Sequence, residues 1–249
     1  MARTFFLMTL IITGLFAYPK WQEAQAQEQI LEATVQITMT VPQWTQGEQQ
    51  DNEPLPIPPE EYRSMTRVKE YVVAEGLGTV VQDNGRSYLV THDHWSQLAA
   101  NTGSVQFRDA AGALLAEMDL YHFKRLILAR DGGTMLLSAP DALQKPAKTE
   151  MNKRDTARDD LWLVHRQEGR LTASRVQKVA AKLKDGVAVW RLQGQVVESG
   201  DSGGGVWANG RLEAVTWTAV MLESPSNTER QATDMSIAAV YMPIPSAQP

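Results

Sequence analysis

The chain has 249 residues, of which 43% are hydrophobic and 21% are charged, and it has no cysteine. This length and composition exclude a small disulfide-stabilised scaffold, a disordered chain and a protein with many membrane spans. Without cysteine there is no thiol catalysis and no zinc site with cysteine ligands. The formal net charge is -5, with 24 basic and 29 acidic side chains, and no basic patch indicates binding to nucleic acid.

The N-terminus has the pattern of a secretory signal peptide. Arg3 precedes an almost uncharged run from Phe5 to Ala17, and Ala24-Gln25-Ala26 matches the small-x-small site of signal peptidase. The apolar run is shorter than the ~20 residues of a membrane-spanning helix, so residues 1–26 are predicted to be cleaved and the mature chain to begin at Gln27. We therefore expect a periplasmic or secreted protein. The alternative is an uncleaved leader that tethers it to the membrane, and no other membrane contact is expected.

Short segments with the periodicity of β strands recur through the rest of the chain. Val35, Ile37, Met39 and Val41 alternate with polar residues, as in a strand with one buried face. Segments of the same kind are Val68 to Val73, Thr79 to Gln82, Ser87 to Thr91, Val105 to Phe107, Ala113 to Met118, Leu126 to Ala129, Leu161 to Val164, Val187 to Leu192 and Leu212 to Val220. Asn84-Gly85 is the strongest hairpin signal, and Ala111-Gly112 and Asn209-Gly210 mark two more. Sustained helical periodicity is absent, apart from one or two turns from Ser96 to Asn101. The pattern predicts an all-β sandwich or a pair of barrels.

Two segments interrupt the strand pattern. Residues 43–63 contain four prolines and five acidic side chains, and this composition predicts a surface loop. Residues 141–160 mix five basic and five acidic side chains with little apolar content, which is typical of a solvated connection. We therefore predict an N-terminal half at residues 27–145 and a C-terminal half at residues 146–249.

The stretch Gly200-Asp201-Ser202-Gly203-Gly204-Gly205 places one serine among glycines. Glycine lets the backbone take a tight turn that points N–H groups inward, and it leaves the serine hydroxyl open to a substrate carbonyl. A serine hydroxyl is a weak nucleophile, so it needs an imidazole to accept its proton and an acid to orient that imidazole. His94, which follows a predicted strand, is the candidate for the imidazole. The alternative is a plain glycine-rich turn.

Three motifs resemble the trypsin-like serine peptidases of the chymotrypsin fold, and above all their bacterial exported branch, the Deg/HtrA proteases. They are Gly-Asp-Ser-Gly-Gly at 200–204, Gly-x-Gly-Thr-Val-Val at 76–81 and Leu-Val-Thr-x-x-His at 89–94. The resemblance covers most of residues 30–243. It implies two antiparallel six-stranded β-barrels with the active site in the cleft between them. It also implies hydrolysis of peptide bonds in peptide or protein substrates through an acyl-enzyme, without a cofactor.

The resemblance assigns roles to single residues. It makes Ser202 the nucleophile, His94 its general base, and the backbone N–H groups of Gly200 and Ser202 the oxyanion hole. Val196 falls on the floor of the primary specificity pocket, where no acidic residue is present, so we expect medium aliphatic or aromatic residues before the scissile bond. The segment that would pair with the substrate comprises Val215, Thr216, Trp217 and Thr218. Gly205 stands where the family usually has proline.

The acid of the triad is the position where the sequence departs from the family's pattern. The family places an aspartate directly before an apolar strand; here that strand is Thr134-Met135-Leu136-Leu137, and Gly133 precedes it. Asp131 follows the order His, Asp, Ser, so we predict that a bulge at the next two glycines brings it to His94. A plain Asp-Gly hairpin is the alternative, and Asp119 is the second choice for the acid. Without any carboxylate at the histidine, the chain would be a catalytically inactive binding or scaffold protein.

The segment His92-Asp93-His94 allows one further interpretation, because two imidazoles on one face of a strand can bind a metal ion. No third ligand has a suitable spacing, so no metal site is predicted. His92 is instead expected to be a surface residue or a hydrogen-bonded strand residue.

Overall fold

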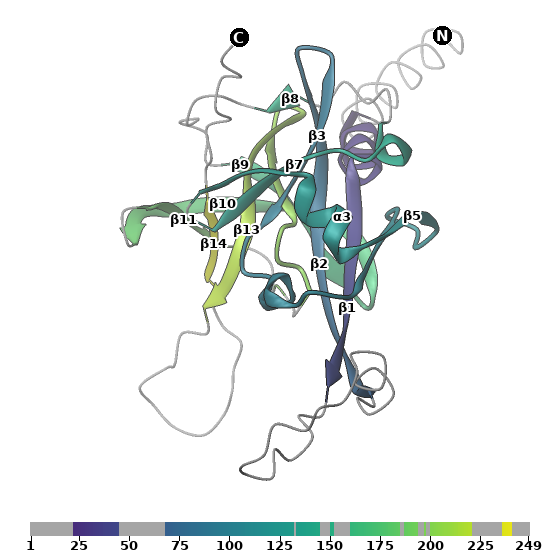
Figure 1. The fold of residues 1–249 in the computed structure, drawn as a ribbon. Coiled ribbons are helices and arrows are strands. Elements are labelled where there is room, and N and C mark those ends of the chain that lie inside the picture. The colour runs from purple at the N-terminus through teal and green to yellow at the C-terminus, as the bar shows by residue number, and fades with distance from the viewer. Residues whose placement is uncertain are drawn as a thin grey trace, which may run out of the picture.

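The computed structural model describes residues 22–44, 68–131, 133–144, 150–151, 160–184, 187–193, 197, 200–220 and 236–240. These residues form two seven-stranded β sheets with few helices (Figure 1). The prediction of an all-β fold is confirmed.

The first sheet contains the strands of the N-terminal part of the chain. They are β1 (Thr34–Trp44), β2 (Val68–Asp83), β3 (Arg86–His92), β4 (Ser104–Arg108), β5 (Leu114–Asp119), β6 (Ile127–Asp131) and β7 (Thr134–Ser138). Their order is β5-β4-β1-β2-β3-β7-β6, and every neighbouring pair is antiparallel. The alternating residues Val35, Ile37 and Met39 of β1 are buried, as the period of two predicts. They pack with Phe107 and Phe123 into the core of this sheet.

The second sheet contains the strands of the C-terminal part. They are β8 (Glu150–Met151), β9 (Asp160–Gln167), β10 (Arg170–Lys184), β11 (Val187–Gln193), β12 (Gly205–Ala208), β13 (Arg211–Val220) and β14 (Ser236–Val240). Their order is β12-β9-β10-β11-β14-β13-β8, and β12 also pairs with β13. The pairing of β8 with β13 is parallel, and the other pairs are antiparallel.

The number of strands differs from the prediction of six in each half. In the second sheet the additional strand is β8, whose two residues are too few to show an alternating pattern in the sequence. In the first sheet β5 and β6 are the edge strands, and no pairing joins them in the part of the chain that the structure describes. The described residues of this sheet therefore form an open seven-stranded sheet.

Left-handed turn residues close the hairpins where the sequence indicated them. Asn84 and Gly85 have φ values of 50° and 74°, and they join Asp83 of β2 to Arg86 of β3. Asn209 and Gly210, with φ values of 52° and 71°, join β12 to β13 in the same way. Two consecutive residues with positive φ match the twist of antiparallel strands, so both of these predicted hairpins are confirmed.

Helical segments are short, and two of them were not expected. Helix α3 (Leu120–Arg125) is capped by Asp119, whose carboxylate accepts a hydrogen bond of 2.7 Å from the backbone N–H of His122. Residues 22–32 are also helical, and they run through the predicted cleavage site after Ala26. No helix in the described ranges is long and apolar enough to cross a membrane.

A cluster of buried side chains joins the two sheets, and we call it the interface cluster. It contains residues of the first sheet, of the second sheet and of the N-terminal helical segment. These include Leu77, Val90, Leu136, Trp162, Trp207, Val215 and Ile30. Burial of each large apolar side chain contributes ~1.5 to 3 kcal/mol, so this cluster fixes the first sheet against the second.

Candidate active site

A cleft of about 500 Å³ contains side chains from both sheets. Its first wall is the segment Val73 to Glu75 of β2, and its second is the segment from His92 to Gln97 that follows β3. Gly200 and Ser202, which precede β12, complete the lining. The structure therefore brings the predicted base His94, the predicted nucleophile and one predicted oxyanion donor to a single cleft.

Backbone hydrogen bonds hold the serine turn, which we define as residues 200–204. The carbonyl of Ser202 accepts a bond of 2.7 Å from the N–H of Leu77 on β2. The N–H of Gly203 donates to the carbonyl of Thr216 at 2.7 Å, and the N–H of Thr216 donates to the carbonyl of Gly204 at 2.8 Å. The turn is thus fixed to β2 on one side and to β13 on the other.

Two glycines of the serine turn have left-handed backbone conformations. Gly200 has a φ of 93° and Gly203 a φ of 88°. A Cβ atom on Gly203 would overlap the carbonyl oxygen of Leu77. The glycines that suggested a tight turn in the sequence are therefore required by conformation at both positions, and at Gly203 by space as well.

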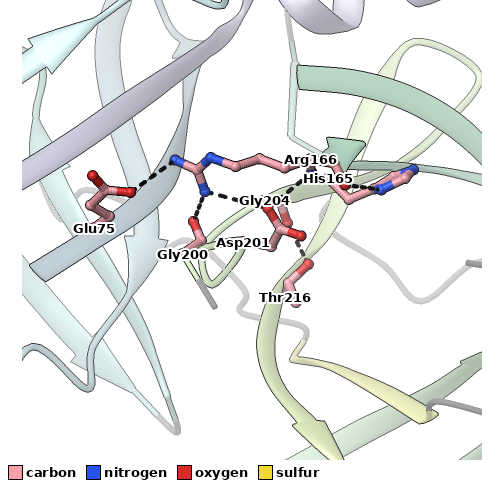
Figure 2. Close-up of polar contacts among 7 residues, drawn as sticks. All are labelled: Glu75, His165, Arg166, Gly200, Asp201, Gly204 and Thr216. Atoms are coloured by element: carbon pink, nitrogen blue, oxygen red, sulfur yellow. Dashed lines mark hydrogen bonds and ion pairs between the residues drawn. The ribbon is translucent and has the colours of Figure 1, made fainter. Parts of the chain in front are cut away.

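Asp201 of the serine turn is completely buried, and one of its partners is Arg166 near the end of β9. One carboxylate oxygen, Oδ1, accepts a hydrogen bond of 2.9 Å from the backbone N–H of Arg166 and lies 3.4 Å from its Nη1. The same Nη1 donates to the carbonyl of Gly200 (Figure 2). Sequence reasoning did not select Arg166. The available signal was a charged residue two positions after the apolar run from Leu161 to Val164.

Thr216, which we predicted to bind the substrate, contacts the serine turn. Its side chain is buried, its hydroxyl donates to the carbonyl of Gly204 at 3.1 Å, and its backbone groups bond to the serine turn. Thr216 therefore supports the serine turn, and its contact with substrate stays a prediction. The side chains of Trp217 and Thr218, and the whole of Val196, lie outside the described residues.

His94 lies two residues after the end of β3, and its ring stacks on that of His92 with the centroids 3.8 Å apart. Partial removal of water by the cleft lowers the pKa of His94 below its usual value of 6.5, and the negative charge of Asp93 opposes this shift. The imidazole is consequently neutral at neutral pH, which is the form that accepts a proton.

His92 differs from the expectation of a surface or hydrogen-bonded residue. It is 3% exposed and stacks between His94 and Trp95, and neither of its ring nitrogens has a hydrogen-bond partner. Burial, assisted by the neighbouring charge of His94, lowers the pKa of His92 from 6.5 to about 2. No group of three or more potential metal ligands occurs among the residues that the structure describes.

The two candidates for the acid have different positions. Asp131 ends β6 and pairs with Thr134 of β7 across a two-residue connection, in which Gly133 has a φ of 101°. The backbone of Asp131 thus belongs to the hairpin that we gave as the alternative to a bulge, and its side chain lies outside the described part. The carboxylate of Asp119 instead contacts the backbone N–H and, at 2.6 Å, the Nδ1 of His122. The carboxylate of Asp119 is therefore engaged in capping helix α3.

The hairpin that carries Asp131 is attached to the segment that carries His94. The N–H of Asp93 donates to the carbonyl of Gly133 at 2.9 Å. Arg130 donates to the backbone carbonyl of Asp93 at 2.9 Å and lies 3.7 Å from its carboxylate. The turn between β6 and β7 is therefore adjacent to the predicted base.

A second histidine and serine pair, His165 and Ser174, lies within the second sheet. Nε2 of His165 is 3.0 Å from the Ser174 hydroxyl, and Nδ1 is 2.9 Å from the carbonyl of Arg166. His165 is 2% exposed, and neither residue lines the cleft described above. With both ring nitrogens hydrogen bonded, this pair stabilises the sheet.

Comparison with solved structures identifies the fold. The active form of the protease Rv3671c from M. tuberculosis is similar with a TM-score of 0.50 and 15% identity, over 85% of this chain and 77% of that one. Catalytically active tobacco etch virus protease has a TM-score of 0.49 and 12% identity, over 86% and 75% of the two chains. A human pathogenic astrovirus serine protease has a TM-score of 0.46 and 16% identity, over 88% and 94%.

The similarity to Rv3671c, whose TM-score reaches 0.50, shows the fold alone, which is that of the chymotrypsin-like proteases. The sequence matches no protein-family model and no curated protein sequence. The Deg/HtrA branch in particular therefore stays a prediction.

Proposed function

We propose that the chain is an exported serine endopeptidase. The observation that carries the proposal is the common cleft lined by His94 from the first sheet and by Gly200 and Ser202 from the second. Support also comes from the two glycines with positive φ and from the backbone bonds that hold the serine turn.

In the proposed reaction, the hydroxyl of Ser202 attacks the carbonyl carbon of the scissile peptide while His94 accepts its proton. The negative charge on the carbonyl oxygen is stabilised by the N–H groups of Gly200 and Ser202. Collapse of this intermediate releases the amine, which takes the proton from His94, and leaves an acyl-enzyme. Water then attacks the ester with the same base, and Ser202 is regenerated. The acid that orients His94 is proposed to be Asp131.

The proposal extends to substrate and location. Val196 is proposed to form the apolar floor of the specificity pocket, with Trp217 and Thr218 beside the substrate backbone, so medium aliphatic or aromatic residues are preferred before the scissile bond. Residues 1–26 are proposed to direct export to the periplasm or the medium. Residues 27–145 and 146–249 are proposed as the two barrel-like halves of the enzyme, with the cleft between them.

The decisive experiment is labelling of the purified mature protein with a fluorophosphonate, which reacts with an activated serine. We expect labelling of the wild type and none of Ser202→Ala. A matched control is Ser96→Ala, because Ser96 lines the same cleft outside the serine turn. Equal labelling of the wild type and Ser202→Ala would refute the assignment of the nucleophile.

The second candidate function is peptide binding by an inactive member of the fold. It is favoured by the ring of His94, which stacks on His92 and has no hydrogen bond to a carboxylate among the described side chains. A protein that binds peptides but is labelled by no fluorophosphonate would support this function over proteolysis.

A further inference from the structure

Arg166 contacts three groups that are distant from it in the sequence, and two of them, Glu75 and Gly200, line the cleft. Its side chain is 13% exposed. Nη1 donates to the carbonyl of Gly200 and lies 3.4 Å from Oδ1 of Asp201, while Nη2 lies 3.9 Å from Oε2 of Glu75. Figure 2 shows the guanidinium between Glu75 on one side and the serine turn on the other.

The burial of Asp201 makes this contact favourable. A completely buried carboxylate is costly unless a positive charge and hydrogen bonds compensate it. Arg166 supplies both, because its backbone N–H and its guanidinium converge on Oδ1 of that carboxylate. Arginine suits the position because its planar group holds several donors in a fixed arrangement, which a lysine does not.

The groups that Arg166 holds lie between the two predicted oxyanion donors. The carbonyl of Gly200 and the side chain of Asp201 follow the first donor, the N–H of Gly200, and precede the second, the N–H of Ser202. The turn is rich in glycine, so its backbone has many accessible conformations unless contacts restrict them. In the described residues, Arg166 is the side chain that holds the carbonyl of Gly200.

We propose that Arg166 is a positioning residue that keeps the N–H groups of the serine turn directed at the oxyanion. It does not touch the substrate; it acts through Gly200 and Asp201. This inference rests on the proposed peptidase function. It adds the specific claim that loss of Arg166 weakens stabilisation of the transition state more than binding of the substrate.

The expected size of the effect follows from the oxyanion hole. Removal of one donor from such a site typically lowers kcat ~10² to 10³-fold. We expect Arg166→Met to lower kcat about 10²-fold, with KM changed less than about threefold, and to slow fluorophosphonate labelling in parallel. Arg166→Lys is expected to recover only part of the loss. In Arg166→Ala, added guanidinium ion at a concentration below denaturation is expected to restore part of the labelling rate.

Two comparisons separate positioning from a loss of folding. The double variant Arg166→Met with Asp201→Asn removes the buried charge that the guanidinium no longer compensates, so its stability should recover while its kcat stays low. The control Arg175→Met removes an exposed arginine of β10 that lies over the ring of Trp162 and does not line the cleft, and it should leave kcat unchanged. Hydrogen exchange of the amides of residues 200–204 should accelerate in Arg166→Met but not in the control.

The outcomes distinguish this inference from the proposed function. If the wild type is active and Arg166→Met has a wild-type kcat, or if the double variant regains both stability and kcat, the positioning role is refuted. If the wild type is neither labelled nor active, the proposed function fails. The hydrogen-exchange measurement then still decides whether Arg166 holds the serine turn. If the amides of residues 200–204 exchange at the same rate in Arg166→Met and in the wild type, Arg166 does not hold the turn.

Discussion

At the scale of single residues, Gly203 occupies a conformation and a space that suit only glycine. Its φ is 88°, and a Cβ atom would overlap the carbonyl oxygen of Leu77. We expect Gly203→Ala to abolish fluorophosphonate labelling and to lower the free energy of unfolding by at least ~2 kcal/mol, because a left-handed non-glycine residue and a displaced β2 both cost energy. Labelling and urea unfolding are the measurements.

Gly210 is the matched control for this substitution. Its φ is 71°, but nothing lies within 4 Å of a Cβ atom at this position. Gly210→Ala should therefore cost only the ~1 to 2 kcal/mol of the left-handed backbone and leave labelling unchanged. If Gly203→Ala and Gly210→Ala had equal effects on labelling and on the free energy of unfolding, the close contact between Gly203 and the carbonyl of Leu77 would not explain the effect at Gly203.

A second prediction concerns the protonation of His94. The general base must be neutral, and loss of water lowers the pKa of His94 below 6.5 while Asp93 raises it. The acid limb of a plot of kcat/KM against pH should therefore have its midpoint below 6.5 in the wild type. Asp93→Asn removes the opposing charge, so the midpoint should move to still lower pH.

The control for the pH profile is Asp109→Asn, a carboxylate that bonds to the N–H groups of Ala111 and Ala113 in its own turn. It should leave the acid limb in place. An acid limb centred above 6.5, or one that moves upward in Asp93→Asn, would contradict the electrostatic interpretation of His94.

The sequence could predict residues whose chemistry is visible in a local motif. The glycines around Ser202 and the strand before His94 are local, so both side chains could be selected. Arg166 could not be, because its function depends on contacts with Gly200 and Asp201, which are far from it in the chain. The departure at Gly205 also has a spatial reason: a larger residue would meet the indole nitrogen of Trp207 and the hydroxyl of Thr79.

At the scale of elements, the β6–β7 hairpin brings the backbone of Asp131 next to the segment of His94. We predict that Asp131→Asn lowers kcat about 10⁴-fold, the cost of removing the acid from such a triad, while the protein remains folded. Steady-state kinetics on a peptide substrate measures this. A kcat within tenfold of the wild type would exclude Asp131 as the acid.

Asp119→Asn is the control for that experiment, because Asp119 was the second candidate and caps helix α3. Asparagine can still cap the helix but lacks the negative charge, so stability should fall only slightly and kcat should not change. A large loss of kcat in this variant alone would move the acid from the β6–β7 hairpin to helix α3.

The strands and helices differ in how well the sequence predicted them. Strands with a clear alternation, such as β1, and hairpins with Asn-Gly turns were predicted because local sequence determines them. The two-residue strand β8 and the helical residues 22–32 were not, because their order depends on packing against distant residues. In that helical segment, Ile30 is 2% exposed within the interface cluster.

At the scale of the whole molecule, the site depends on contacts between the two sheets. The hydrogen bond from Leu77 to Ser202 and the ion pair of Glu75 with Arg166 each join β2 to the C-terminal part of the chain. Each half could be recognised from its own motifs. The relative placement of the two halves follows from the interface cluster, whose residues come from both halves. The sequence around each of these residues does not indicate which residues of the other half it contacts.

His92 links this packing to the pH dependence of stability. Its buried ring has a pKa of about 2, whereas in the unfolded chain it titrates near 6.5. Between these values the unfolded state binds more protons than the folded state, so the free energy of unfolding falls as pH decreases below 6.5. One such group contributes a slope of up to ~1.4 kcal/mol per pH unit.

We therefore predict that His92→Asn flattens this slope, although the lost packing lowers stability at neutral pH. The difference in the free energy of unfolding between wild type and variant should shrink as pH falls from 6.5 toward 4, and urea unfolding at several pH values measures it. Leu98→Ala is the control, because Leu98 packs against the core of the first sheet and carries no charge. Its loss of stability should be the same at each pH. A pH-independent difference for His92→Asn as well would show that protonation of His92 does not limit stability in acid.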